Sequence, residues 1–147
     1  MKTAGKNDHH HWFFESKTDS GEVCQFELDG PGYRDGKWAY KVRSPGCSDF
    51  FEFRVVPFDE EHVRIDMMTH NDRPEFMKKG IPEYLIPTVA KELNKKILSS
   101  IKDGRPIKDE YRTLNAEKFW KRMVEKKKAI YHDESDRYEF TSEEILG

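Results

Sequence analysis

The feature that most constrains this chain is a change of hydrophobic period near residue 70. Before that point, apolar and polar residues alternate in segments 23–28, 38–43, 50–58 and 61–70. Such alternation is typical of β-strands that bury one face. After it, apolar residues recur at every fourth position: Ile81, Leu85, Val89 and Leu93. Because that spacing is typical of an amphipathic helix, the two halves of the chain are predicted to fold differently.

The first half is predicted to be an antiparallel meander of four or five strands. Short polar links separate the alternating segments, as expected for hairpins. Residues 29–37 are rich in glycine and are expected to form a loop. In segment 61–70, one face is predicted to carry Val63, Ile65 and Met67, and the other Arg64, Asp66 and Met68.

The second half is predicted to be a helix, a short strand, a second helix and a final hairpin. Pro82 suits the first turn of the first helix, and Asn94 suits its end. Residues 95–100 have the length of a short buried strand, and residues 115–129 place apolar side chains on one helical face. Residues 129–141 can form the last hairpin.

Length and charge limit the classes of function. A chain of 147 residues fits one domain, and we expect a polar leader at 1–11 followed by a single domain at 12–147. The net charge of -2 argues against attraction of the whole surface to nucleic acid or to an anionic membrane. The sequence has no apolar run near the roughly 20 residues that span a bilayer, and residues 1–14 have no apolar signal core. We therefore expect a cytoplasmic protein with no membrane partner.

The cysteines and the histidine run do not predict a metal site. Cys24 and Cys47 lack C-x-x-C spacing and are expected to be free thiols in a reducing compartment. Residues 9–11 are three consecutive histidines, which cannot all face one ion from an extended segment because neighbouring side chains point to opposite sides.

The residues before the first helix have the composition of an anion site. Lys78 and Lys79 precede Gly80, and the helix follows directly. A helix N-terminus presents unpaired N–H groups and the positive end of the helix dipole, and glycine permits close backbone approach. This arrangement favours a phosphate-bearing cofactor, although Gly80 also fits a plain turn.

With these elements in this order, the sequence resembles the GNAT acyltransferases over roughly residues 50–140. The family's pyrophosphate loop reads Q/R-x-x-G-x-G/A, and the matching positions here are Met77, Lys78, Lys79, Gly80, Ile81 and Pro82. Ala116, Phe119 and Trp120 match the spacing of the family's later A-x-x-F-Y segment. The resemblance implies an α+β fold: a mixed, mostly antiparallel central sheet flanked by helices, in a GNAT-like architecture.

The resemblance also implies acetyl-CoA as the co-substrate and an amine of a small molecule or protein as the acceptor. The pantetheine arm would lie along Met67, Met68 and Thr69. The phosphates would be held by Lys78, Lys79, Gly80, Ile81 and Pro82.

Four residues are candidates for acid–base chemistry in this reaction. An amine must lose a proton to attack a thioester, and Asp66, His70 and Glu75 are the candidate bases. A backbone N–H near Met68 would stabilise the oxyanion. Where the family often has a tyrosine as general acid, this chain has a tryptophan, so Tyr131 is the candidate substitute.

The sequence departs from the family pattern in ways that leave catalysis open. Met77 stands where the family has glutamine or arginine, and Pro82 has no N–H to donate to phosphate. The alternative is therefore an inactive GNAT-like module that binds a protein, a nucleotide or single-stranded nucleic acid, or an unrelated structural α+β protein. Basic residues at 118–128 support nucleic acid, but interspersed acidic residues argue against it. A homodimer is also left open.

Overall fold

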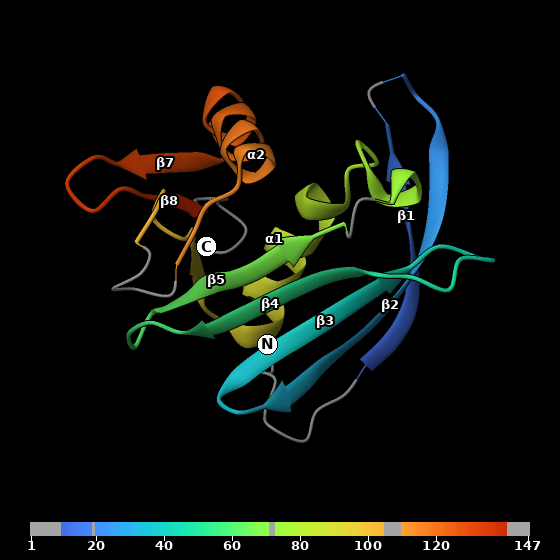
Figure 1. Ribbon diagram of the computed structural model, residues 1–147, viewed down its shortest axis with the longest axis horizontal. Helices are drawn as coiled ribbons and strands as arrows, with labels where there is room; N and C mark the ends of the chain where they lie inside the picture. The colour runs from blue at the N-terminus through green and yellow to red at the C-terminus, as the bar shows by residue number, and fades with distance from the viewer. Residues whose placement is uncertain (1–9, 19, 71–72, 105–109, 141–147) are drawn as a thin grey trace.

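The computed structural model describes residues 10–18, 20–70, 73–104 and 110–140 (Figure 1). Its strands are β1 (His10–Lys17), β2 (Val23–Arg34), β3 (Lys37–Arg43), β4 (Phe51–Pro57), β5 (His62–Thr69), β6 (Lys96–Leu98), β7 (Ala129–His132) and β8 (Arg137–Phe140). Its helices are the short 3-10 helix η1 (Pro74–Phe76), α1 (Ile81–Leu93) and α2 (Leu114–Glu125).

The described strands form one curled sheet in the order β1-β2-β3-β4-β5-β6-β8-β7 (Figure 1). Strands β1 to β5 follow one another as an antiparallel meander. The pair β5–β6 is parallel, and α1 forms the crossover between these two strands. The predicted meander and the predicted final hairpin, β7–β8, are therefore confirmed.

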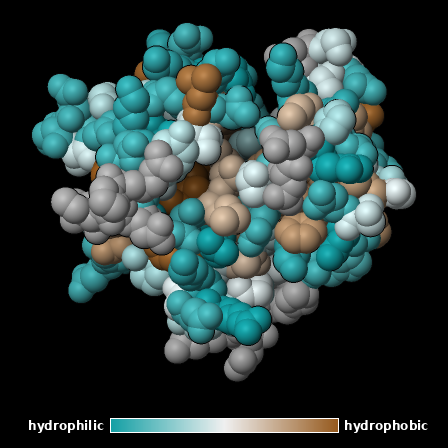
Figure 2. Space-filling model, in the orientation of Figure 1, coloured by the Kyte–Doolittle hydropathy of each residue, from teal (hydrophilic) through white to brown (hydrophobic). Residues whose placement is uncertain are grey.

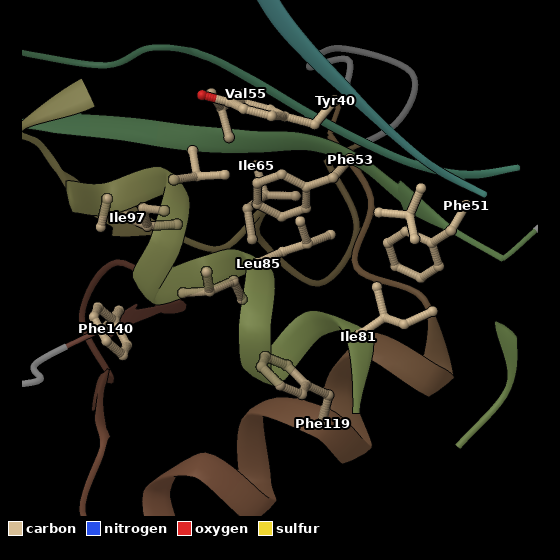
Figure 3. Packing of buried hydrophobic residues seen from close by; sticks show 14 of the residues in the cluster. Tyr40, Phe51, Phe53, Val55, Ile65, Ile81, Leu85, Ile97, Phe119 and Phe140 are labelled. Atoms are coloured by element: carbon tan, nitrogen blue, oxygen red, sulfur yellow. The ribbon is translucent and has the colours of Figure 1, made fainter. Parts of the chain in front are cut away.

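The apolar face of the sheet packs against α1, which lies between the strands and α2 (Figure 3). Phe53 of β4 and Ile65 of β5 face Leu85 of α1, and Phe119 approaches from α2. Each fully buried side chain of this size contributes about 1.5–3 kcal/mol through removal of apolar surface from water. The alternating pattern of the first half thus produces one buried face, as predicted.

Helix α1 has the bounds that the sequence predicts. Gly80 caps its start with φ 78°, and Asn94 caps its end with φ 55°. The backbone N–H of Asn94 donates to carbonyl groups of the last helical turn. Left-handed caps of this kind favour glycine and asparagine, which explains the choice of residue at both ends.

The predicted faces of β5 are correct up to Ile65 and wrong beyond it. The register with β4 pairs Ile65 with Val55 and then Met67 with Arg54, so Asp66 is an extra residue. This β-bulge reverses the alternation, and Met68 rather than Met67 packs against the core. A bulge has no signature in hydrophobic periodicity, so the sequence pattern did not reveal it.

The expected α+β fold, a central sheet flanked by helices in a GNAT-like architecture, is wrong. Within the described residues, strands dominate: one curled eight-stranded sheet accompanies only two α-helices. Both α-helices lie on the apolar side of the sheet (Figure 3). In β3–β5, the charged side chains Lys37 and Arg54 are both ion-paired with Asp66. The fold is therefore β-rich.

The segment at residues 29–37, predicted to be a loop, is largely strand, which adds to the strand content of the fold. Residues 29–34 belong to β2, and the turn is confined to the following two residues. Gly30 lies so close to β3 that a Cβ atom there would be 2.8 Å from the carbonyl oxygen of Ala39. This glycine serves close strand packing rather than loop formation.

The beginning of the described chain differs slightly from the expected leader. Strand β1 begins at His10, whereas the leader was expected to extend to residue 11. Residues 1–9 lie outside the described part. None of the described helices combines the length and apolar character required to cross a membrane.

Candidate functional site

The candidate site lies where the parallel strands β5 and β6 separate. The two strands pair only between residues 62–64 and 96–98. Strand β6 then ends, while β5 continues to Thr69. Among the described strands, the second half of β5 consequently has a neighbour on its β4 side but none in the β6 direction.

A pocket of about 400 Å³ occupies this separation. Its apolar lining consists of Ile65, Met67, Met68, Ala116 and Trp120. Its polar lining consists of Arg54, Asp66, Thr69, Ser99, Ser100, Glu110, Tyr111, Arg112 and Thr113. The face shown in Figure 2 is mainly hydrophilic, with apolar atoms gathered near its centre.

The register indicates which backbone groups of β5 face this pocket. The carbonyl of Glu61 accepts from Lys96 N–H at 2.8 Å, and the carbonyl of Ile65 accepts from Ser100 Oγ at 2.7 Å. Residues 61 and 65 therefore point toward β6. Because the bulge adds one residue, Met68 is the next residue after Ile65 whose backbone points away from β4. The N–H and C=O of Met68 therefore also point toward the β6 side.

Ser100 and Arg112 hold the segment that follows β6 in place. The hydroxyl of Ser100 donates to β5, while the carbonyl of Ser100 accepts from Arg112 Nη1 at 2.8 Å. Arg112 also donates to Glu117 at 2.8 Å and to the carboxylate of Asp136 at 2.9 Å, and its side chain is only 3% exposed. Ser100 is thus bonded to β5 through its side chain, while its carbonyl accepts from Arg112 and from Ser99 Oγ at 2.9 Å.

A second ion pair supports the same wall of the pocket. Arg137 donates to both carboxylate oxygens of Glu110, at 2.7 and 2.9 Å, and to the carbonyl of Ser99 at 3.0 Å. Burial opposes ionisation of Glu110, but the hydrogen bonds from Arg137 and the charge of Arg64 lower its pKa overall. This wall is therefore a fixed, ionised structure at neutral pH.

Asp66, a candidate base, lines the pocket but is held in ion pairs. Its Oδ2 lies 2.7 Å from Arg54 Nε and 3.0 Å from Lys37 Nζ. Burial acts to raise the pKa of Asp66, and the hydrogen bonds from Lys37 and Arg54 outweigh it, so the pKa is lowered. A carboxylate stabilised in this way is a poor proton acceptor at neutral pH.

The other two candidate bases differ in their relation to the pocket. His70 directly follows the pocket-lining Thr69, and its Nε2 lies 3.4 Å from the side-chain nitrogen of Asn115, next to the pocket-lining Ala116. Glu75 is paired with Arg73 at 3.1 Å. Its own backbone N–H and Arg73 lower the pKa of Glu75, and it does not line the pocket.

The candidate general acid, Tyr131, lies on β7 outside the pocket lining. Its hydroxyl donates to Asp136 at 2.8 Å, and this hydrogen bond raises the pKa of Tyr131. Tyr111 is the tyrosine that lines the pocket, and it is 48% exposed. Sequence reasoning overlooked Tyr111 because it lies in a polar segment with no hydrophobic period.

The residues expected around the phosphates lie elsewhere than the pocket lining. None of Lys78, Lys79, Gly80, Ile81 and Pro82 lines the pocket. Instead, this segment contacts the end of β1. The hydroxyl of Ser16 donates to the carbonyl of Lys79, and Lys79 Nζ lies 3.5 Å from Glu22. Ile81 is fully buried. The phosphate-binding role of this segment stays a prediction.

The structure brings together only some of the residues that the sequence singled out. Asp66, Met67, Met68 and Thr69 line the pocket together, as do Ala116 and Trp120 of α2. Sequence reasoning missed Arg54, Ser99, Ser100, Glu110, Tyr111, Arg112 and Thr113. Ser99 and Ser100 could have been found from the sequence, because they directly follow a short apolar run. Polar residues at the end of a strand are common site residues.

Among the described residues, no group of three or more His, Cys, Asp or Glu side chains is arranged to hold a metal ion. Comparison of the chain with family models, curated proteins and solved structures found no match. The resemblance to GNAT acyltransferases stays a prediction, and the pocket is the feature that bears on function.

Proposed function

We propose that the protein binds acetyl-CoA in the pocket between β5 and β6 and transfers the acetyl group to an amine. The observation that carries this proposal is the β5 edge beyond residue 64, whose backbone groups at Met68 face a pocket rather than another strand. The cytoplasmic location expected from the sequence is part of the same proposal.

An exposed strand edge suits an extended ligand that contains amides. Such a ligand pairs with the strand through N–H and C=O groups, as an added strand would. The pantetheine arm of coenzyme A is a ligand of this kind. The carbonyl and N–H of Met68 supply the pairing groups on the protein side.

The inner end of the pocket is apolar and rigid. Trp120 is 1% exposed and stacks on Tyr138 with ring centroids 5.7 Å apart. Ala116 lies one helical turn before Trp120 and leaves space beside it. A small acetyl group and the methylene groups of the arm fit such a lining, because burial removes their apolar surface from water.

The chemical step requires one base and one proton donor. The amine nitrogen forms a bond to the thioester carbon, the carbon–sulfur bond breaks, and a proton leaves the nitrogen. We assign His70 as the proton acceptor, because it borders the pocket and imidazole accepts protons near neutral pH. Tyr111, the phenol in the lining, is the donor to the departing thiolate.

A second function, binding without turnover, is favoured by one observation. Asp66 and Glu75 are both ion-paired, and Tyr131 is hydrogen-bonded to a carboxylate. Asp66, Glu75 and Tyr131 are thus held by charged partners, and the fourth candidate, His70, contacts Asn115. In this case acetyl-CoA or another amide-containing ligand binds in the pocket, and no acetyl product forms.

Calorimetric titration with acetyl-CoA, followed by an assay of free thiol release with a panel of amines, tests both functions. We expect Ala116→Trp to abolish binding, because it fills the pocket beside Trp120. Lys118→Trp is the matched control, since residue 118 is exposed on the same helix and does not line the pocket.

The outcomes separate the two functions. Binding by the wild type and Lys118→Trp but not by Ala116→Trp supports the site, and thiol release then supports transfer. Binding without thiol release supports the binding function. No binding of acetyl-CoA by the folded wild-type protein refutes the acetyl-CoA proposal.

A further inference from the structure

Strand β1 forms one edge of the sheet and exposes both backbone and aromatic surface. It pairs with β2 along eight positions and, among the described strands, has no neighbour on its other side. Lys79 and Gly80 lie against only its last two residues, Ser16 and Lys17. Phe13, at its centre, is 64% exposed, the highest value for an aromatic side chain in the described part of the chain. A long, exposed apolar edge is a template for pairing with another strand.

The hydrogen-bond pattern identifies the backbone groups on the outer edge. The N–H of Thr18 donates to the carbonyl of Glu22 at 2.9 Å, in the same register as the β1–β2 pairs. Even-numbered residues of β1 therefore bond to β2. Because hydrogen bonds alternate along an antiparallel strand, the N–H and C=O groups of His11, Phe13 and Glu15 point outward.

We propose that β1 pairs antiparallel with β1 of a second copy of this chain, with the two-fold axis at Phe13. In this register Phe13 lies opposite Phe13 of the partner subunit, and His11 lies opposite Glu15 of the partner subunit. Each of these pairs joins outward-facing residues and exchanges two main-chain hydrogen bonds.

The side chains on the exposed face fit this register. His11, Phe13 and Glu15 share one face of β1, since successive residues alternate. The two-fold axis places each His11, which also lies 3.4 Å from Glu27 of its own chain, opposite a second carboxylate on both sides of a central phenylalanine pair. Opposite charges and paired aromatic rings both stabilise cross-strand contacts. Shifting the register by two residues would place Phe13 opposite Glu15 and His11 opposite Lys17, and both favourable matches would be lost.

The opposite sheet edge is a weaker candidate for self-association. Strand β7 has only four residues, although Ile130 on it is 51% exposed. The β1 edge is also separated from the acetyl-CoA pocket by β2, β3 and β4. The dimer therefore leaves the pocket open and does not depend on the proposed function.

Sedimentation velocity over a range of protein concentrations tests the proposal. The wild type should reversibly form a dimer. Phe13→Lys places two lysines opposite each other across the axis, and we expect it to weaken the dimer at least about tenfold. Ile130→Lys is the matched control, because it makes the same kind of change at the other edge, and it should leave the dimer unchanged.

A charge exchange tests the register independently of Phe13. With Glu27→Gln as the background, since Glu27 lies 3.4 Å from His11, Glu15→Lys should weaken the dimer, and the double variant His11→Glu with Glu15→Lys should restore it. A wild-type protein that remains monomeric at every concentration overturns the proposal. A dimer that survives Phe13→Lys but not Ile130→Lys also overturns it, as does a double variant no tighter than Glu15→Lys.

Discussion

Replacing Arg112 by methionine should be among the most destabilising single changes in the chain. Methionine keeps much of the side-chain length but removes every hydrogen-bond donor. Arg112 donates to the carbonyls of Ser100 and Asp136 and to the carboxylates of Glu117 and Asp136, at distances from 2.8 to 3.1 Å. Its removal leaves the buried carbonyl of Ser100 without its cationic donor.

The expected loss follows from the burial of this cation. Removing one partner of a buried, hydrogen-bonded ion pair costs about 3–5 kcal/mol. The carboxylates keep other donors, since the hydroxyl of Tyr138 bonds to Glu117 at 2.6 Å and the backbone N–H of Lys102 bonds to Asp136 at 2.7 Å. We therefore expect a loss near the lower end of that range. For a chain of this length it corresponds to a decrease in Tm of about 10 °C.

Urea unfolding followed by circular dichroism measures the loss, and Arg122→Met is the control. Arg122 belongs to α2 and is 51% exposed, with a single ion pair to Glu83 at 3.4 Å. An exposed pair of this kind contributes roughly 0–1 kcal/mol. If Arg112→Met lowers the free energy of unfolding no more than Arg122→Met does, the idea that Arg112 fixes the pocket wall is refuted.

Three further predictions concern the cap of α1, the pH dependence of stability and the chemical step. Gly80→Ala should lower the free energy of unfolding more than Gly36→Ala does. Both glycines have φ near 80°, but of the two only Gly80 would place its new Cβ against a neighbouring atom, 2.6 Å from Ser16 Oγ. Equal losses of free energy in urea unfolding would contradict this prediction. Because the pKa of Asp66 is lowered, its contribution to folding stability is present above the ordinary carboxyl pKa of about 4 and is lost as the pH falls. Asp66→Asn should therefore flatten the decrease in the unfolding midpoint between about pH 6 and 3. A slope equal to that of the wild type would exclude the ion-paired role. If transfer occurs, His70→Gln should lower kcat about 100-fold, whereas Tyr131→Phe should leave kcat unchanged. The reverse pattern would reassign the acid–base groups.

The sequence predicted the elements well because hydrophobic period is a local property. The alternation around Phe53 and the four-residue repeat through Leu85 each report one buried face, and both faces meet in the core. The capping residues of α1 could also be predicted, since Gly80 and Asn94 adopt the left-handed conformation that their residue types favour.

The sequence could not predict how these elements frame the site. The bulge at Asp66 depends on the register between β4 and β5, which no spacing in one strand reveals. The roles of Ser100 and Arg112 depend on contacts between residues 12 and 35 positions apart along the chain. The expected helix-flanked architecture was inferred from a resemblance, and short motifs around Gly80 carry no information about how many helices accompany the sheet.

The most direct test of the account is a titration of ¹⁵N-labelled protein with acetyl-CoA, monitored by NMR. The account predicts that the amide signals of Met68 and Thr69 shift saturably, together with that of Ala116 across the pocket. It also predicts that the amides of the β1 edge, such as Phe13, do not shift. Saturable shifts confined to Lys78–Gly80, or no saturable shifts at all, would contradict the claim that the separated strands β5 and β6 form the cofactor site.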